Sequence, residues 1–316
     1  MDRRTVLAGL GAVAACPVHA QDAVAPWTPP PKWSAPVIDM HWHMRKIAEA
    51  NLAHMDGAGV TAAGLLTSGA VADTVHGFQA QYPDRFPSWF AATDITRPEA
   101  EAFLIQAAKD GARGIGELKF HVAADGPELR RMYALAAELD VPVLVHFQEV
   151  GQAAAGGTFS AGWKNFAVML KAYPKTKFIG HADAFWVNIS ADYHEDTAYP
   201  EGPIVPGGIT DRLLSDYPNL FGDLASNSGN LALSRDPEFT RGFLVRHQDK
   251  LHFGSDCNCT DGRGGGPGQN NPGVAPRMRG KCVARETLKV LTASTTPDVF
   301  RKLVWTNGRR LMKLAV

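Results

Sequence analysis

The sequence carries no excess charge of either sign: its 316 residues include 32 lysines and arginines and 32 aspartates and glutamates. Proteins that bind nucleic acids usually have a basic face that neutralises phosphates. The balance argues against a nucleic-acid partner and favours a small-molecule substrate.

Near the N-terminus there is no apolar run long enough to anchor the chain in a bilayer, for which about 20 residues are needed. The stretch 6–15 is apolar but short. It follows a pair of arginines at 3 and 4, and it precedes Val-His-Ala at 18–20, a small-x-small pattern typical of a cleavage site. We expect residues 1–22 to be a twin-arginine-type signal peptide and the protein to be periplasmic or secreted, with no stable membrane span.

Cysteine is scarce, with four residues in the chain. Cys16 lies in the predicted signal peptide; it also permits a lipoprotein anchor, which the proline after it disfavours. In an oxidising compartment the other three allow at most one disulfide, and we expect Cys257 or Cys259 to pair with Cys282. A metal site at this Cys-Asn-Cys is disfavoured, because no cysteine or histidine follows at the spacing of structural zinc sites.

The sequence contains no internal repeat. It also lacks a Gly-rich phosphate-binding turn, which argues against an enzyme of hydride or phosphoryl transfer. The segment 23–36 is proline-rich and cannot continue a helix or a central strand, so we expect an extended tether or strap. No later break in composition divides the chain. Residues 37–316 therefore form one predicted domain.

Short apolar runs alternate with helical stretches through this domain. Because parallel strands need crossover helices, eight such units predict an α/β fold, the (β/α)₈ TIM barrel. The expected strands are 37–41, 60–66, 87–92, 114–120, 141–146, 177–181, 220–223 and 250–254. The clearest helices are 47–54, 98–109, 127–139, 165–172 and 237–246.

Potential metal ligands occur where these strands end. His41 and His43 are two residues apart on the first strand, so both side chains point to one side. Barrel enzymes keep their active sites at the carboxyl ends of the strands. Imidazole and carboxylate groups at those ends suit a divalent metal, with zinc favoured and manganese or iron as alternatives. Later strands add Glu117, His146, His181 and Asp256.

Together, Asp39-Met40-His41-Trp42-His43, the two later histidines and Phe253-Gly254-Ser255-Asp256 resemble the amidohydrolase superfamily, above all its amidohydrolase-2 group. The resemblance extends from about residue 37 to 313 and includes the stretch 236–250. It implies a TIM barrel and a metal held by His41, His43, His146 and Asp256, with His181 as a ligand or proton relay.

Strand four leaves the number of ions open between one and two. The resemblance implies that Glu117 or a carboxylated Lys119 bridges two ions; otherwise Glu117 makes an ion pair or supports a ligand. Lys119 is alternatively a substrate-carboxylate contact or a salt-bridge partner, and His121 a residue of the pocket wall.

These features predict a metal-dependent hydrolase that cleaves a C–O or C–N bond in an ester, lactone or amide. A divalent ion makes hydroxide available near neutral pH. Asp256 is the expected general base and acid, and His181 stabilises the oxyanion or the attacking water. The alternative is a metal-dependent, non-oxidative decarboxylase of an aromatic or enol acid. A homo-oligomer is compatible with either.

Two long loops are candidates for contact with the substrate. The Gly- and Pro-rich loop 258–281 follows the last strand and is expected to cover the metal, with Arg263, Arg277 and Arg279 as possible partners of a carboxylate. The loop 183–206 contains Phe185, Trp186, Tyr193 and Tyr199, which form either an aromatic wall or the loop's own packing. Trp42 is expected to face away from the barrel interior.

Overall fold

The computed structural model describes residues 31–152, 157–194, 197–270 and 274–315. The predicted signal peptide and most of the proline-rich segment lie outside these ranges. Residues 31–36 of that segment lie against the end of helix α1 (Ala48–Ala58), where the Trp33 indole donates to the Ala58 carbonyl at 3.1 Å. Among the described residues, no helix is long and apolar enough to cross a membrane.

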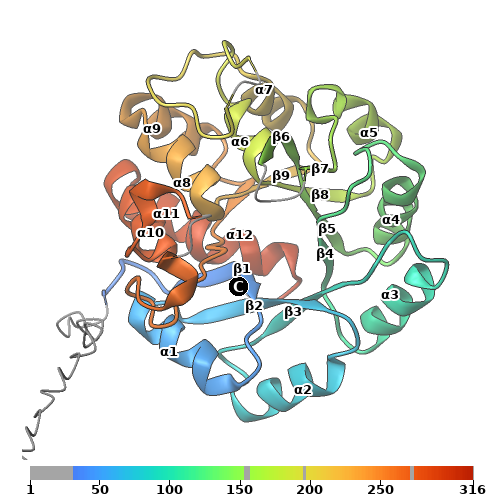
Figure 1. Cartoon of the computed structure of the whole chain (residues 1–316). Helices are drawn as coiled ribbons and strands as arrows, with labels where there is room; N and C mark the ends of the chain where they lie inside the picture. Colours follow the sequence, from blue (N-terminus) through green and yellow to red (C-terminus); the bar gives the residue numbers. More distant parts are fainter. Residues whose placement is uncertain (1–30, 153–156, 195–196, 271–273, 316) are drawn as a thin grey trace, which may run out of the picture.

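A parallel eight-stranded barrel forms the centre of the molecule (Figure 1). It closes where the Met40 amide donates to the Phe253 carbonyl and the Asp256 amide to the His41 carbonyl, each at 3.0 Å. In sheet order the strands are β1 (Ile38–His43), β2 (Ala62–Ser68), β3 (Ser88–Ala92), β4 (Gly114–Leu118), β5 (Pro142–His146), β8 (Lys177–His181), β9 (Leu220–Asp223) and β10 (Leu251–His252).

Helices surround the barrel in the order of the chain (Figure 1). After α1 come α2 (Ala72–Gln81), α3 (Ala100–Lys109), α4 (Pro127–Glu138), α5 (Ala167–Ala172), α6 (Asp183–Val187), α7 (Ile209–Asp216), α8 (Ser226–Ser234), α9 (Pro237–Arg246), α10 (Val283–Ser294), α11 (Pro297–Arg301) and α12 (Asn307–Leu311). A π-helical stretch, Lys302–Thr306, joins the last two.

Local sequence explains where several helices begin. α9 starts with Pro237 in its first turn, where the missing amide costs nothing, and the Asp236 carboxylate accepts from the Phe239 amide at 3.0 Å. α11 begins in the same way, with Pro297 in its first turn and the Thr296 side chain accepting from the Val299 amide. Such caps satisfy amides that have no partner within the helix.

Apolar residues fill the barrel and the layer around it. Inside, residues from opposite strands meet in one buried cluster, and α12 contributes to it; examples are Met40, Leu144, Ile179, Leu311 and Met312. A larger cluster packs the outer faces of the strands against the helices. The strands therefore have apolar residues on both faces, as expected for a parallel sheet.

The eight predicted strands are confirmed, with ends that differ by up to two residues from those expected. The fourth strand ends at Leu118, so Lys119 and His121 lie beyond it. The sequence did not indicate the antiparallel hairpin β6 (Gln148–Gln152) and β7 (Gly157–Phe159), which follows β5.

Candidate metal centre

Two histidines of β1 point into the carboxyl end of the barrel. His41 is fully buried, and its Nε2 lies 3.7 Å from Glu117 Oε2 and 3.9 Å from Asp256 Oδ1. His43 is half-exposed, with Nε2 at 3.5 and 3.3 Å from the same two atoms. The spacing of two residues therefore brings both imidazoles to one pair of carboxylates.

Glu117 lies at the centre of the cluster. Its Oε2 atom faces the two histidines of β1. Its Oε1 atom makes a short contact with His146 Nδ1 and lies 3.6 Å from His181 Nε2. One carboxylate thus presents its two oxygens to two different pairs of histidines.

Asp256 closes the cluster from the segment after β10. Its Oδ2 atom lies 3.9 Å from His181 Nε2, while Oδ1 faces the histidines of β1. The side chain is 22% exposed and that of His43 51%, whereas His41 and His181 are fully buried. The cluster therefore opens to solvent beside Asp256 and His43.

All six residues predicted as metal ligands are brought together by the structure. Three overlapping sets each place three ligand atoms within 4.8 Å of one another. The sets are His41–His181–Asp256, His41–His43–Glu117 and Glu117–His146–His181.

A seventh residue, Asp223 at the end of β9, belongs to the site but was not predicted from the sequence. Its buried Oδ2 atom lies 2.6 Å from His41 Nδ1 and 3.4 Å from His181 Nδ1. A carboxylate at Nδ1 fixes the imidazole tautomer and leaves the Nε2 lone pair free for a metal. The available signal was its place at the carboxyl end of a predicted strand.

The seam between the first and last strands holds β1 in place beneath the cluster. Asp39 Oδ1 accepts from the His41 amide at 3.1 Å and from the Ser255 amide at 2.9 Å. A Cβ atom on Gly254 would stand 2.3 Å from Asp223 Oδ1 and 2.6 Å from His41 Cβ. Only glycine therefore leaves room for the contact between Asp223 and His41.

In the cluster, burial raises the pKa values of the carboxylates, and the nearby histidines lower them. Burial raises the pKa of Glu117, but the histidines around it, His146 foremost, hold that pKa well below its ordinary value. The pKa of Asp223 is lowered in the same way by His41, and that of Asp256 by His41 and His43. Burial and the nearby His41 lower the pKa of His181 to about 3, so its imidazole stays neutral.

These residues fit a divalent cation. His41 Nε2 and His181 Nε2 are buried and make no hydrogen bond within the described residues. Buried polar atoms are rarely left without a partner, and buried carboxylates need compensating charge. A cation between the imidazoles and the carboxylates would satisfy both requirements.

Lys119 and His121, predicted to contact the substrate, lie together against the β6–β7 hairpin. The Lys119 ammonium lies 5.1 Å from the centre of the Phe159 ring, and the His121 ring stacks on Phe159 at 4.1 Å. The ring of His146 meets Phe159 edge-on at 5.9 Å. Phe159 therefore connects the two exposed residues to the cluster.

The two loops differ from expectation at several points. Phe185 and Trp186 belong to α6 and are buried in the core, so they form no aromatic wall. Arg277 donates to Asn227, Asn230 and Ser234 of α8. Its guanidinium is therefore engaged within the protein, because the loop packs onto that helix.

The expected disulfide is not formed. Cys257, Cys259 and Cys282 are free thiols: the Cys257 Sγ atom lies 3.4 Å from that of Cys259 and 3.8 Å from that of Cys282. A disulfide requires about 2.05 Å between the sulfurs.

Trp42 faces away from the barrel interior, as expected, and its indole donates to Asn51 at 2.8 Å.

The barrel is similar to two solved structures. One is a protein from Pseudomonas putida provisionally named a 2-pyrone-4,6-dicarboxylic acid hydrolase, with TM-score 0.54, 14% identity and coverage of 89% of this chain and 98% of that chain. The other is dihydroorotase from Campylobacter jejuni, with TM-score 0.51, 16% identity and coverage of 89% and 84%. At these identities the likeness shows a shared barrel fold, in agreement with the fold predicted from the sequence. No protein-family model and no curated protein matches the chain significantly.

Proposed function

We propose that this protein is a metal-dependent hydrolase that cleaves a C–O or C–N bond of a small ester, lactone or amide. The observation that carries the proposal is the placement of Glu117, whose two oxygens face two separate pairs of histidines. A carboxylate in this position suits two adjacent divalent ions.

The chain's own residues would supply the ligands of the two ions. His41 and His43 with Glu117 would hold one ion, and His146 and His181 with Glu117 the other. Zinc is the favoured ion because the set combines imidazole and carboxylate donors. When bound, such ions polarise a carbonyl and lower the pKa of water towards about 7. Asp223 would keep the Nε2 atoms of His41 and His181 directed into the site.

Asp256 is suited to move the proton. Its carboxylate lies at the open side of the cluster, and the neighbouring histidines keep its pKa below the ordinary value, so it is ionised at neutral pH. Its oxygen would accept the proton of the attacking water and return it to the leaving oxygen or nitrogen. His181, neutral and buried, is better placed as a ligand than as the relay.

Lys119 and His121 would contact the substrate beside Phe159. The ammonium of Lys119 is exposed, so it is available to a carboxylate on the substrate. This position favours an acidic ester, lactone or amide over a neutral one.

The first test is the metal content of the purified protein by elemental analysis. It is measured beside a His41→Ala/His43→Ala variant and a Glu117→Gln variant. We expect two equivalents to be lost in the Glu117→Gln protein and at least one in the double variant. A Glu117→Gln protein that keeps its full metal content would contradict the shared role of Glu117.

The second test separates hydrolysis from decarboxylation. Esters, lactones and amides with a carboxylate are incubated in ¹⁸O-labelled water, with Asp256→Asn as the control. Hydrolysis predicts label in the product and its loss in the variant. Release of carbon dioxide without incorporation of label would overturn the proposal in favour of the decarboxylase.

A further inference from the structure

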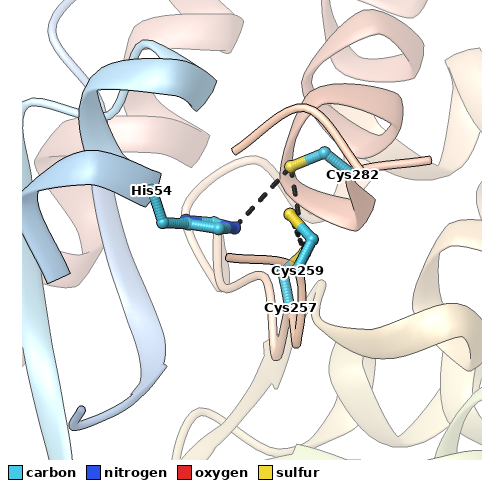
Figure 2. A group of neighbouring side chains, drawn as sticks. All are labelled: His54, Cys257, Cys259 and Cys282. Atoms are coloured by element: carbon cyan, nitrogen blue, oxygen red, sulfur yellow. Dashed lines mark hydrogen bonds between the residues drawn. The ribbon is translucent and has the colours of Figure 1, made fainter. Parts of the chain in front are cut away.

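A second cluster of metal-binding side chains lies outside the candidate metal centre. Figure 2 shows His54 of α1 pointing towards Cys257, Cys259 and Cys282. Cys257 and Cys259 follow β10, and Cys282 directly precedes α10. The four ligand atoms lie within 4.8 Å of one another. His54, Cys259 and Cys282 are buried, and Cys257 is half-buried.

Three of the six separations between the ligand atoms lie close to the edges of a tetrahedron. With Zn–S bonds of about 2.3 Å and Zn–N bonds of about 2.0 Å, the edges measure about 3.5–3.8 Å. The Cys257 and Cys259 sulfurs are 3.4 Å apart, and those of Cys257 and Cys282 are 3.8 Å apart. Cys282 Sγ lies 3.8 Å from His54 Nε2.

The surroundings give His54 no competing role. Its Nδ1 atom is buried and has no hydrogen-bond partner within the described residues. The ring meets Trp42 edge-on at 4.7 Å, which directs Nε2 towards the cysteines. An imidazole whose Nε2 faces the thiols, and whose Nδ1 has no partner within the described residues, indicates a ligand rather than a residue of the apolar core.

The loop that carries the cysteines is itself held in place. Arg45 donates to the Cys259 carbonyl at 2.7 Å and to the Cys257 carbonyl at 3.4 Å. The Cys257 amide donates to Ser255 Oγ at 3.3 Å. These contacts bring both thiols of the Cys-Asn-Cys to the same side, although the sequence spacing is shorter than that of common zinc motifs.

We propose that His54, Cys257, Cys259 and Cys282 bind one structural zinc ion. Three thiolates and one imidazole select a soft or borderline ion, in contrast to the carboxylate-rich candidate metal centre. Four protein ligands leave no open position for a substrate, as in structural sites. A disulfide between two of the cysteines would leave the third thiol and His54 without a partner.

The site would fasten the scaffold of the candidate metal centre. It joins α1, the segment after β10 and the start of α10. Cys257 directly follows Asp256 in the sequence. His54 packs on Trp42, which lies between His41 and His43 in the sequence. The zinc ion would therefore hold β1 and the segment after β10 together from outside the barrel.

The test uses the full chain with the His41→Ala/His43→Ala/Glu117→Gln background, which lacks the candidate metal centre. We expect elemental analysis to find about one equivalent of zinc that survives mild chelation. Cys259→Ser/Cys282→Ser in this background should lose it. His54→Phe, which keeps packing against Trp42, should lose it too, whereas His54→Cys should restore it.

A measurement on the unaltered protein covers the case in which the variants do not fold. Titration with a mercurial thiol reagent should release one equivalent of zinc as the three thiols react, and cobalt(II) in its place should show thiolate charge-transfer absorption. Blocking all three thiols without release of any zinc would overturn the proposal. So would a mass two hydrogens lower under non-reducing conditions, which indicates a disulfide.

Discussion

Single residues decide how the imidazoles of the candidate metal centre are oriented. Asp223 is the clearest case, since it touches the histidines only through their Nδ1 atoms. It is a positioning residue: it contacts neither the open side of the cluster nor the place of the substrate. Its removal should alter metal affinity before it alters the fold.

We expect Asp223→Asn to weaken metal binding by about 10–100-fold, because the neutral amide no longer fixes the tautomer of His41. Competition with a chromophoric chelator measures the affinity, and circular dichroism confirms that the barrel is folded. Asp211→Asn, at a carboxylate remote from the site, is the control. An unchanged affinity in Asp223→Asn would rule out the positioning role.

Gly254 provides a second prediction at this scale. Gly254→Ala places a methyl group against Asp223 and His41, which should cost about 1–3 kcal/mol by overpacking and reduce the metal content. Gly77→Ala is the matched control, since nothing lies within 4 Å of its added Cβ and alanine favours the helix. Thermal melts measure the stability of the two variants, and elemental analysis measures their metal content. Equal stability and equal metal content in Gly254→Ala and Gly77→Ala would contradict the prediction.

The sequence was informative about residues that end strands. It placed His41, His43, Glu117, His146, His181 and Asp256 at one end of the barrel, because strand ends converge there. It missed the role of Asp39 and the participation of His54, since their partners lie more than two hundred residues away in the chain. Spacing rules for zinc could not find a site whose ligands come from three separate elements.

At the scale of elements, packing between neighbouring helices supports the barrel from outside. α7 and α9 are joined by Asp211, which accepts from Arg246 at 2.7 Å and from His247 at 2.6 Å. The Asp211 side chain is only 13% exposed, so these bonds are shielded from water. Burial raises the pKa of Asp211, yet its bonds to His247 and Arg246 bring it below the ordinary value.

Asp211→Asn should therefore lower the free energy of unfolding by about 1–2 kcal/mol at pH 7. A carboxyl whose folded pKa is depressed stabilises the protein above its unfolded pKa. That advantage declines as the pH falls from about 4 through the lower folded pKa. Urea melts at pH 7 and pH 3 should show the difference shrinking. Glu101→Gln, from an exposed pair, should change stability by only about 0.5 kcal/mol. A pH-independent deficit in Asp211→Asn would contradict this account.

Element boundaries were predicted best where apolar runs end at a polar residue, as in β8 and β9, whose limits match. α2 and α8 were not among the helices named from the sequence; a glycine interrupts each of them. The short α6 was read as part of a loop. Its burial depends on tertiary contacts of Phe185 and Trp186 that a local pattern cannot reveal.

For the molecule as a whole, metal and fold should be linked. An ion that binds only the folded barrel stabilises it by about 2.7 kcal/mol when present at 100 times its dissociation constant. This corresponds to a rise in Tm on the order of 5 °C for a chain of this size. Calorimetry of the metal-free protein with and without zinc measures the effect.

Calcium serves as the control for that experiment. It prefers six to eight oxygen ligands, so a cluster rich in imidazole should not gain the same stability from it. Equal shifts with both ions would indicate a nonspecific effect of charge rather than the proposed sites.

The seam between β1 and the segment after β10 also bears on how the protein is made. Met40 and His41 form backbone hydrogen bonds with Phe253 and Asp256. The first strand therefore cannot complete its pairing until the last part of the barrel has been synthesised. During synthesis a nascent chain carries its histidines long before it carries Asp256. Firm capture of metal can therefore begin only after the ring is complete, and prematurely terminated products would remain metal-poor and distinguishable from the finished protein.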